Sequence, residues 1–160
     1  MNFSKSNVFA GVKQSKIIYP LLIGAVLYLA NYNFLKYMFY LYPATIPLTM
    51  GDGSWWLSQS ALIKILYVGI LAPFLEELIF RRGILNWFAE RKQFILGLIV
   101  SSILFGFWHM VSGWGILKAI DMMLIGIVFG LAYKKYGFKG SLLAHYSNNF
   151  MSLIFMLVLI

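Results

Sequence analysis

The chain has 160 residues, of which 61% are hydrophobic and only 11% are charged, and its formal net charge is +8. A soluble domain carries about 25% charged residues, so this composition excludes an ordinary soluble fold and indicates an integral membrane protein. Cysteine is absent, which excludes a disulfide framework, thiolate metal ligands and a cysteine nucleophile.

Long apolar stretches predict the transmembrane architecture. About 20 apolar residues are needed to cross the hydrocarbon core as a helix, and about five stretches reach or approach this length. In chain order they are Ile17–Phe39, Leu57–Phe80, Phe94–Val111, Ile116–Tyr133 and Ser141–Ile160. None of them alternates between polar and apolar residues with a period of two, so a transmembrane β-barrel is excluded. We therefore expect an all-α fold, a polytopic transmembrane helical bundle of about five spans.

The basic residues predict how the chain is oriented in the membrane. Ten of the 13 lysines and arginines lie on alternate connections, whereas the connections Tyr40–Trp56 and Ser112–Gly115 have none. The three basic clusters are Lys5, Lys13 and Lys16; Arg81, Arg82, Arg91 and Lys92; and Lys134, Lys135 and Lys139. By the positive-inside rule, the amino terminus lies in the cytoplasm and the carboxyl terminus outside. Because the clusters form no single stripe, nucleic acid is not an expected partner.

The same pattern predicts the domain organisation. Residues 1–16 are polar and basic and are expected to form a cytoplasmic tail, and residues 17–160 form a single multi-pass domain in the cell membrane. A basic start followed by an apolar run is also typical of a secretory signal. However, Ile17–Phe39 is longer than a signal core and no convincing cleavage site follows it, so we interpret it as the first span.

Two adjacent glutamates interrupt the second apolar stretch. A charge at membrane depth costs roughly 2.5 to 3.5 kcal/mol on insertion scales, so each of them needs a partner or a function. Glu77 and Arg81 are four residues apart with the acid first, which is the favoured order for a helical ion pair. Glu76 points about 100° away around the helix and has no such partner in its own segment. Glu76 is therefore the better candidate for a working base, although both glutamates could instead mark a helix end at the interface.

The two histidines of the chain lie in other predicted spans. If the second and third spans form a hairpin around Arg91 and Lys92, Glu76 and His109 are level to within about one helical turn. His145 and Asn149 are four residues apart on one face of the fifth span. A lone histidine on an apolar helix is more often a core residue, and His109 also lies near the nominal outer end of its span. Either the segment Gly83–Lys92 projects into the cytoplasm, or the third span is partly re-entrant.

These side chains can converge in the interior of the bundle. A carboxylate can take a proton from water, one imidazole can steer that water, and a second imidazole with a carboxamide can donate to the oxyanion of a tetrahedral intermediate. The set Glu76, His109, His145 and Asn149 therefore predicts water-mediated hydrolysis.

The predicted fourth span contains one acidic residue, Asp121. Lys118 lies three residues earlier on the same helical face. We therefore predict a local ion pair near the membrane interface at this position, rather than a functional site.

Three short motifs follow one another in separate spans. They read Glu76-Glu77-Leu-Ile-Phe-Arg81, Phe105-Gly-Phe-Trp-His109 and His145-Tyr-Ser-Asn-Asn149. In this order and spacing the chain resembles the CAAX protease and bacteriocin-processing (CPBP, or Abi) family of intramembrane proteases, which includes the type II CAAX prenyl endopeptidases. The resemblance implies a helical bundle around a buried polar cavity. It also implies hydrolysis of a peptide bond near the carboxyl end of a substrate or within a small peptide.

The resemblance also implies a role for each motif residue. Glu76 would activate water, His109 would help to position it, and His145 with Asn149 would form the oxyanion hole. Three further residues, Glu77, Arg81 and Phe105, would support the site. The chain is shorter than the prenyl endopeptidases, and the small bacterial members of the family act in bacteriocin self-immunity or maturation. A bacteriocin precursor or a membrane receptor is therefore the expected peptide or protein partner, together with the lipid bilayer.

Three alternatives remain open from the sequence. In the first, zinc is bound by Glu76, His109 and His145. The chain has no His-Glu-x-x-His motif, so we rank this alternative second and expect no cofactor. A second alternative is a non-catalytic membrane immunity protein that sequesters a toxin peptide or its receptor. A third is a proton or ion carrier that uses the buried acids and histidines.

Overall fold

The described part of the chain is entirely helical in its regular structure. The computed structural model describes residues 6–50 and 58–158, and no strand occurs in these ranges. The elements are α1 (Ser6–Leu41), α2 (Thr45–Met50), α3 (Ala61–Lys64), η2 (Ile65–Leu71), α4 (Ala72–Glu76), η3 (Glu77–Leu85), α5 (Asn86–Glu90), α6 (Phe94–Val111) and α7 (Ile116–Val158). The all-α prediction is thereby confirmed. Lys5, Leu57 and Ile160, which belong to the predicted tail and span ends, lie outside the described residues.

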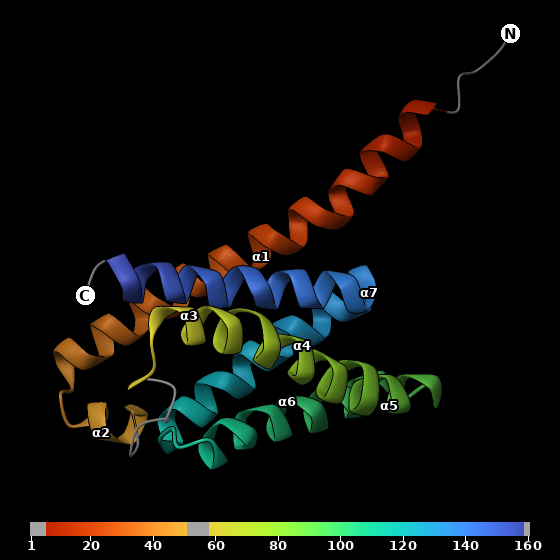
Figure 1. Ribbon diagram of the computed structural model, residues 1–160. Helices are drawn as coiled ribbons and strands as arrows, with labels where there is room; N and C mark the ends of the chain where they lie inside the picture. The colour runs from red at the N-terminus through yellow and green to blue at the C-terminus, as the bar shows by residue number, and fades with distance from the viewer. Residues whose placement is uncertain (1–5, 51–57, 159–160) are drawn as a thin grey trace, which may run out of the picture.

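Three of these helices are long and apolar enough to cross a membrane. They cover Lys16–Leu41, Phe94–Val111 and Ile116–Leu157. The last is interrupted at Gly137, whose φ of 73° and ψ of −171° are not helical. Glycine takes a positive φ without steric cost, so the chain can reverse there. From this turn the helix 138–158 returns toward the side of the bundle on which the helix 116–136 begins (Figure 1), and the two helices correspond to the predicted fifth and fourth spans. The number of spans stays a prediction.

Residues 61–90 form one continuous helical segment in which α-helical and π-helical stretches alternate. Ser60 caps its start by accepting a hydrogen bond from the Ile63 amide. At the end of η2, the Ala72 amide bonds to the carbonyl of Tyr67, five residues earlier, which is the π-helical register. The next residue is Pro73, which has no amide hydrogen. In the same register its partner would be the carbonyl of Val68, which is therefore left free for a bond from elsewhere.

The core lies where α6, η3 and both halves of α7 meet. It consists of Phe80, Phe105, Met122, Ile125, Phe129, Ala132 and Ala144. Around this core the helix backbones approach one another closely, because glycines stand at the points of contact. A Cβ atom at Gly24 of α1 would lie 2.0 Å from the carbonyl oxygen of Ala144, and one at Gly106 of α6 would lie 2.3 Å from that of Ala119.

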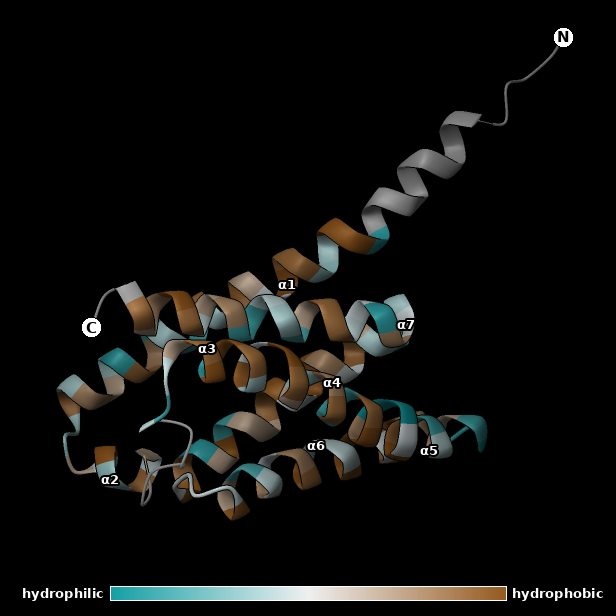
Figure 2. Cartoon of the chain, in the orientation of Figure 1, coloured by the Kyte–Doolittle hydropathy of each residue, from teal (hydrophilic) through white to brown (hydrophobic). Residues whose placement is uncertain are grey.

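The outer surface of the bundle is apolar over most of its length. Exposed large hydrophobic side chains occur on α1, η2, α6 and α7, and Figure 2 shows hydrophobic colour along most of these helices. Hydrophilic residues gather at the α5 end, where the 61–90 segment projects beyond the apolar part (Figure 2). Because α6 is an unbroken helix, this arrangement favours the projecting alternative for Gly83–Lys92 over a re-entrant third span.

Candidate active site

A buried ion pair in η3 forms the base of the site. Arg81 Nε lies 3.7 Å from Glu77 Oε1, and both side chains are completely buried. Arg81 Nη2 also donates to the carbonyl of Gly126 at 3.1 Å, and its guanidinium lies 4.5 Å from the centre of the Phe105 ring. The predicted helical ion pair is therefore present, and contacts from α6 and α7 hold it in place.

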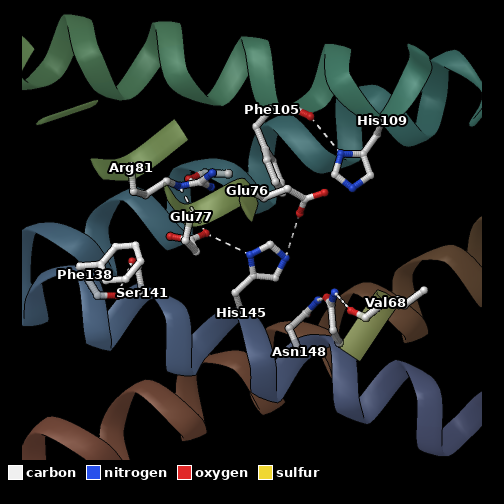
Figure 3. A network of polar contacts seen from close by, with 12 residues as sticks. Val68, Glu76, Glu77, Arg81, Phe105, His109, Phe138, Ser141, His145 and Asn148 are labelled. Carbon is white, nitrogen blue, oxygen red and sulfur yellow. Dashed lines mark hydrogen bonds and ion pairs between the residues drawn. The ribbon is translucent and has the colours of Figure 1, made fainter. Parts of the chain in front are cut away.

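Glu77 also contacts a histidine from a distant part of the chain. His145 Nδ1 and Glu77 Oε1 are 3.0 Å apart (Figure 3). The imidazole is stacked on Phe129, with ring centres 4.4 Å apart and an angle of 26° between the planes. A carboxylate acceptor at Nδ1 places a proton on that nitrogen and directs Nε2 to the other side of the ring. Glu77 thus orients His145 as well as bracing the helix.

Glu76 lies on that other side of His145. The distance from Glu76 Oε2 to His145 Nε2 is 3.5 Å, and the carboxylate approaches the ring from α4 (Figure 3). Sequence reasoning left Glu76 without a partner in its own segment, and the structure supplies one from α7. The imidazole therefore lies between two adjacent carboxylates.

The charges of this cluster balance only with one additional proton. Two ionised glutamates and one arginine would leave a net negative charge, and burying an unbalanced charge costs several kcal/mol. One proton shared between Glu76 and His145 makes the cluster neutral. The gap between Glu76 Oε2 and His145 Nε2 is where the two groups can exchange that proton.

His109 enters the site from the end of α6. Its Nδ1 lies 2.9 Å from the carbonyl oxygen of Phe105, one turn earlier. A carbonyl can only accept, so Nδ1 carries the proton and Nε2 has a free lone pair. The ring of Phe105 stands edge-on to His109 and to His145, with ring centres 4.8 and 5.8 Å away. Phe105 therefore packs against both imidazoles.

Asn149 links α7 to the irregular part of the 61–90 segment. Its Nδ2 donates to the carbonyl of Val68 at 2.9 Å. This carbonyl is the one that Pro73 leaves without a π-helical partner, and a buried carbonyl without a hydrogen bond costs about 1–3 kcal/mol. The side chain of Asn149 thus replaces the missing backbone bond, and one of its two N–H groups is used for this purpose.

The four predicted catalytic residues line one cavity of about 420 Å³. Glu76, His109, His145 and Asn149 come from α4, α6 and α7, and Phe105 and Asn148 also contribute to the wall. Aromatic and aliphatic side chains form most of the remainder. The predicted convergence is therefore present in the structure, and the cavity provides room for a short stretch of peptide beside the carboxylate.

The structure adds residues that sequence reasoning missed. The carbonyl of Val68 carries no side-chain signal, and the one feature of the sequence related to it is Pro73, five residues later. Asn31 of α1 was also missed: its side chain donates to Asp121, and it lines the active-site cavity. No pattern within α1 marks it, because its partner is 90 residues away.

Lys118 and Asp121 form the predicted local ion pair. Lys118 Nζ lies 2.7 Å from Asp121 Oδ2, and both side chains are largely buried. Lys118 lines the active-site cavity, whereas Asp121 lines a neighbouring, mostly apolar cavity of about 460 Å³. The pair therefore lies between the two cavities.

The zinc alternative would use Glu76, His109 and His145 as ligands. In residues 6–50 and 58–158, no group of three or more His, Cys, Asp or Glu side chains is arranged to hold a metal ion. Each nitrogen of His145 faces a different carboxylate, and Nδ1 of His109 is bonded to a backbone carbonyl.

Comparison with known proteins agrees with the motifs. Residues 58–151 match the family described as type II CAAX prenyl endopeptidase, Rce1-like, and this match covers more than half of the chain and every motif residue. No curated protein and no solved structure is significantly similar to the chain. The family match and the three long apolar helices together identify a membrane protein. The chain therefore belongs to the type II CAAX prenyl endopeptidase, Rce1-like family of intramembrane endopeptidases.

Proposed function

We propose that the protein is a glutamate-dependent intramembrane endopeptidase in which Glu76 activates the attacking water. The observation that carries this proposal is the cavity shared by Glu76, His109, His145 and Asn149, with Glu76 Oε2 3.5 Å from His145 Nε2. Addition of water to a peptide carbonyl requires a general base, a second group that orients the water, and hydrogen-bond donors for the oxyanion.

In the reactive state, the shared proton resides on His145 and Glu76 is ionised. Water binds between the Glu76 carboxylate and Nε2 of His109, whose lone pair accepts one of the water hydrogens. Glu76 takes the other hydrogen as the water oxygen bonds to the carbonyl carbon. The Nε2–H of the His145 imidazolium and the remaining N–H of Asn149 donate to the oxyanion. Glu76 then delivers its proton to the leaving nitrogen as the carbon–nitrogen bond breaks.

Glu77 and Arg81 act on this chemistry indirectly. Glu77 accepts from His145 Nδ1 and so stabilises the imidazolium form, while Arg81 balances the charge of Glu77. Neither side chain lines the cavity, so we assign both a supporting role.

Glu76→Gln tests the proposal directly. Detergent-purified protein is incubated with a mixture of internally quenched apolar peptides, and cleavage is followed by fluorescence and mass spectrometry. Glu76→Gln should lower kcat by about 100- to 10,000-fold because the base is lost. The matched control is Glu90→Gln, at an exposed glutamate of α5 that accepts a hydrogen bond from Asn86, one turn earlier in the same helical segment. Turnover by Glu76→Gln equal to that of the wild type would refute the proposal.

We further propose that no metal takes part and that the biological substrate is a small peptide, such as a bacteriocin precursor, or a segment of a membrane receptor. The chemistry above needs no Lewis acid, which supports the first point. The three motifs, and the cavity that their residues line, support the second. If the protein confers immunity to a bacteriocin, cells that express the Glu76→Gln variant should be killed by that bacteriocin, whereas cells that express the wild type should survive. Full protection by this variant would instead favour the non-catalytic immunity protein.

A further inference from the structure

Asn148 contacts the predicted oxyanion residue and lies inside the third motif, at a position to which no role has been assigned. Its Nδ2 lies 3.3 Å from Asn149 Oδ1, and both side chains line the active-site cavity. A relay of two hydrogen bonds therefore runs from the Asn148 amide through the Asn149 amide to the carbonyl of Val68.

The direction of this relay follows from the backbone. Val68 offers only a carbonyl, so Asn149 must turn its nitrogen toward it and its oxygen away. The oxygen of Asn149 then faces Asn148, which must present its own nitrogen in turn. A rotated Asn148 amide would place two carbonyl oxygens against each other. The Asn149 amide is therefore held at both ends, its nitrogen by the carbonyl of Val68 and its oxygen by the N–H of Asn148.

This orientation leaves one polar atom of Asn148 without a hydrogen bond. Its Oδ1 is buried and has no hydrogen-bond partner among the described residues. A buried oxygen without a hydrogen bond destabilises the fold. A polar side chain kept in a membrane protein at this cost, in the wall of a reactive cavity, is more useful to the site than to the fold.

We propose that Asn148 is a positioning residue of the hydrolytic site. Its N–H group holds Asn149 Oδ1, so that the free N–H of Asn149, and not its oxygen, faces the developing oxyanion. Asn148 itself touches neither the water nor the scissile bond. This inference rests on the proposed function, and it assigns a role to a residue that lies between two motif positions.

Asn148→Leu is the informative variant because leucine has nearly the same shape but neither donates nor accepts hydrogen bonds. With the peptide that the wild type cleaves, kcat should fall about tenfold while KM changes little, since the lost contact matters only as the oxyanion forms. Asn149→Ala should lower kcat by about 100-fold or more. The matched control is Asn33→Leu, at an exposed asparagine of α1 that donates a hydrogen bond to the carbonyl of Leu29 in its own helix.

The double variant distinguishes positioning from an independent effect. If Asn148 acts through Asn149, adding Asn148→Leu to Asn149→Ala should cause no further loss of kcat. A further tenfold loss in the double variant would mean that the two residues act independently, and would overturn the inference. Turnover by the wild type in the same assay tests the proposed function, whereas the ratios between variants test the role of Asn148.

Thermal stability gives a second readout that needs no substrate. Asn148→Leu removes a buried oxygen without a partner, so its Tm in detergent should equal or exceed that of the wild type. A lower Tm together with lower activity would indicate a purely structural role and would overturn the inference. An unchanged kcat at unchanged Tm would do the same.

Discussion

Asn149 donates a hydrogen bond of 2.9 Å to the backbone carbonyl of Val68, which is 81 residues earlier in the chain. The bond exists because Pro73 cannot supply the amide hydrogen that the π-helical register of η2 requires. A break in the hydrogen bonding of one helix is thus satisfied by a side chain of another, and that side chain lies next to His145 in the cavity. The carbonyl that Pro73 leaves free in the 61–90 segment thus helps to set the position of Asn149, the proposed oxyanion residue.

Pro73→Ala should uncouple these two features. An alanine amide would bond to the Val68 carbonyl within the helix and would compete with Asn149. We expect kcat to fall about tenfold, as for other loss of oxyanion alignment, while Tm stays equal or rises because a helix-interrupting proline is removed. Kinetics and thermal unfolding of the purified protein measure both effects. Pro47→Ala, at an exposed proline of α2, is the control and should change neither quantity. A Pro73→Ala enzyme with full activity would contradict the coupling.

The sequence predicted the architecture well because the relevant signals are local. Long apolar stretches required helices, and the four-residue spacing of Glu77 and Arg81 required an ion pair if the segment was helical. The convergence of Glu76, His109 and His145 was also predictable, since buried polar side chains in a membrane protein must find one another.

The remaining details depend on contacts between distant segments. The bond from His145 to Glu77 was missed because Glu77 already had a partner in its own helix. The π-helical stretches were missed because periodicity does not distinguish them from α-helix over so few residues. The free carbonyl of Val68 has no sequence signal beyond a proline whose effect depends on the helical register.

Arg81 and Arg82 provide a direct comparison of a buried and an exposed charge. Arg81 is completely buried against Glu77, whereas Arg82 is exposed beside the ring of Phe138. Arg81→Gln leaves Glu77 buried without its counter-charge, so the free energy of unfolding should fall by about 3–5 kcal/mol. Arg82→Gln should change it by less than about 0.5 kcal/mol. Thermal or denaturant unfolding in detergent checks both values, and equal destabilisation by the two variants would be inconsistent with the buried ion pair.

Gly24 should not tolerate even a methyl group. A Cβ atom there would lie 2.0 Å from the carbonyl oxygen of Ala144 in α7, the residue directly before His145. Gly24→Ala must therefore push α1 away from α7, which we expect to cost about 1–3 kcal/mol and to lower activity by shifting His145. Gly83→Ala is the matched control, because its Cβ would meet the nearest atom at an ordinary 3.5 Å. If Gly24→Ala retained the Tm and kcat of the wild type, the close approach of α1 to α7 would be wrong.

The orientation in the membrane is still a prediction, and the absence of cysteine makes it simple to test. Each introduced thiol is the only one in the protein, so its labelling reports a single position. Tyr42 and Gln93 are exposed and lie on successive connections, and replacing them removes none of the basic residues that direct insertion. On intact cells, an impermeant maleimide should label Tyr42→Cys at once and Gln93→Cys only after permeabilisation. A carboxyl-terminal reporter that folds only outside the cytoplasm should be active. The opposite labelling pattern would show that the orientation is the reverse of the predicted one. An inactive reporter together with the expected labelling would show that the chain crosses the membrane an even number of times.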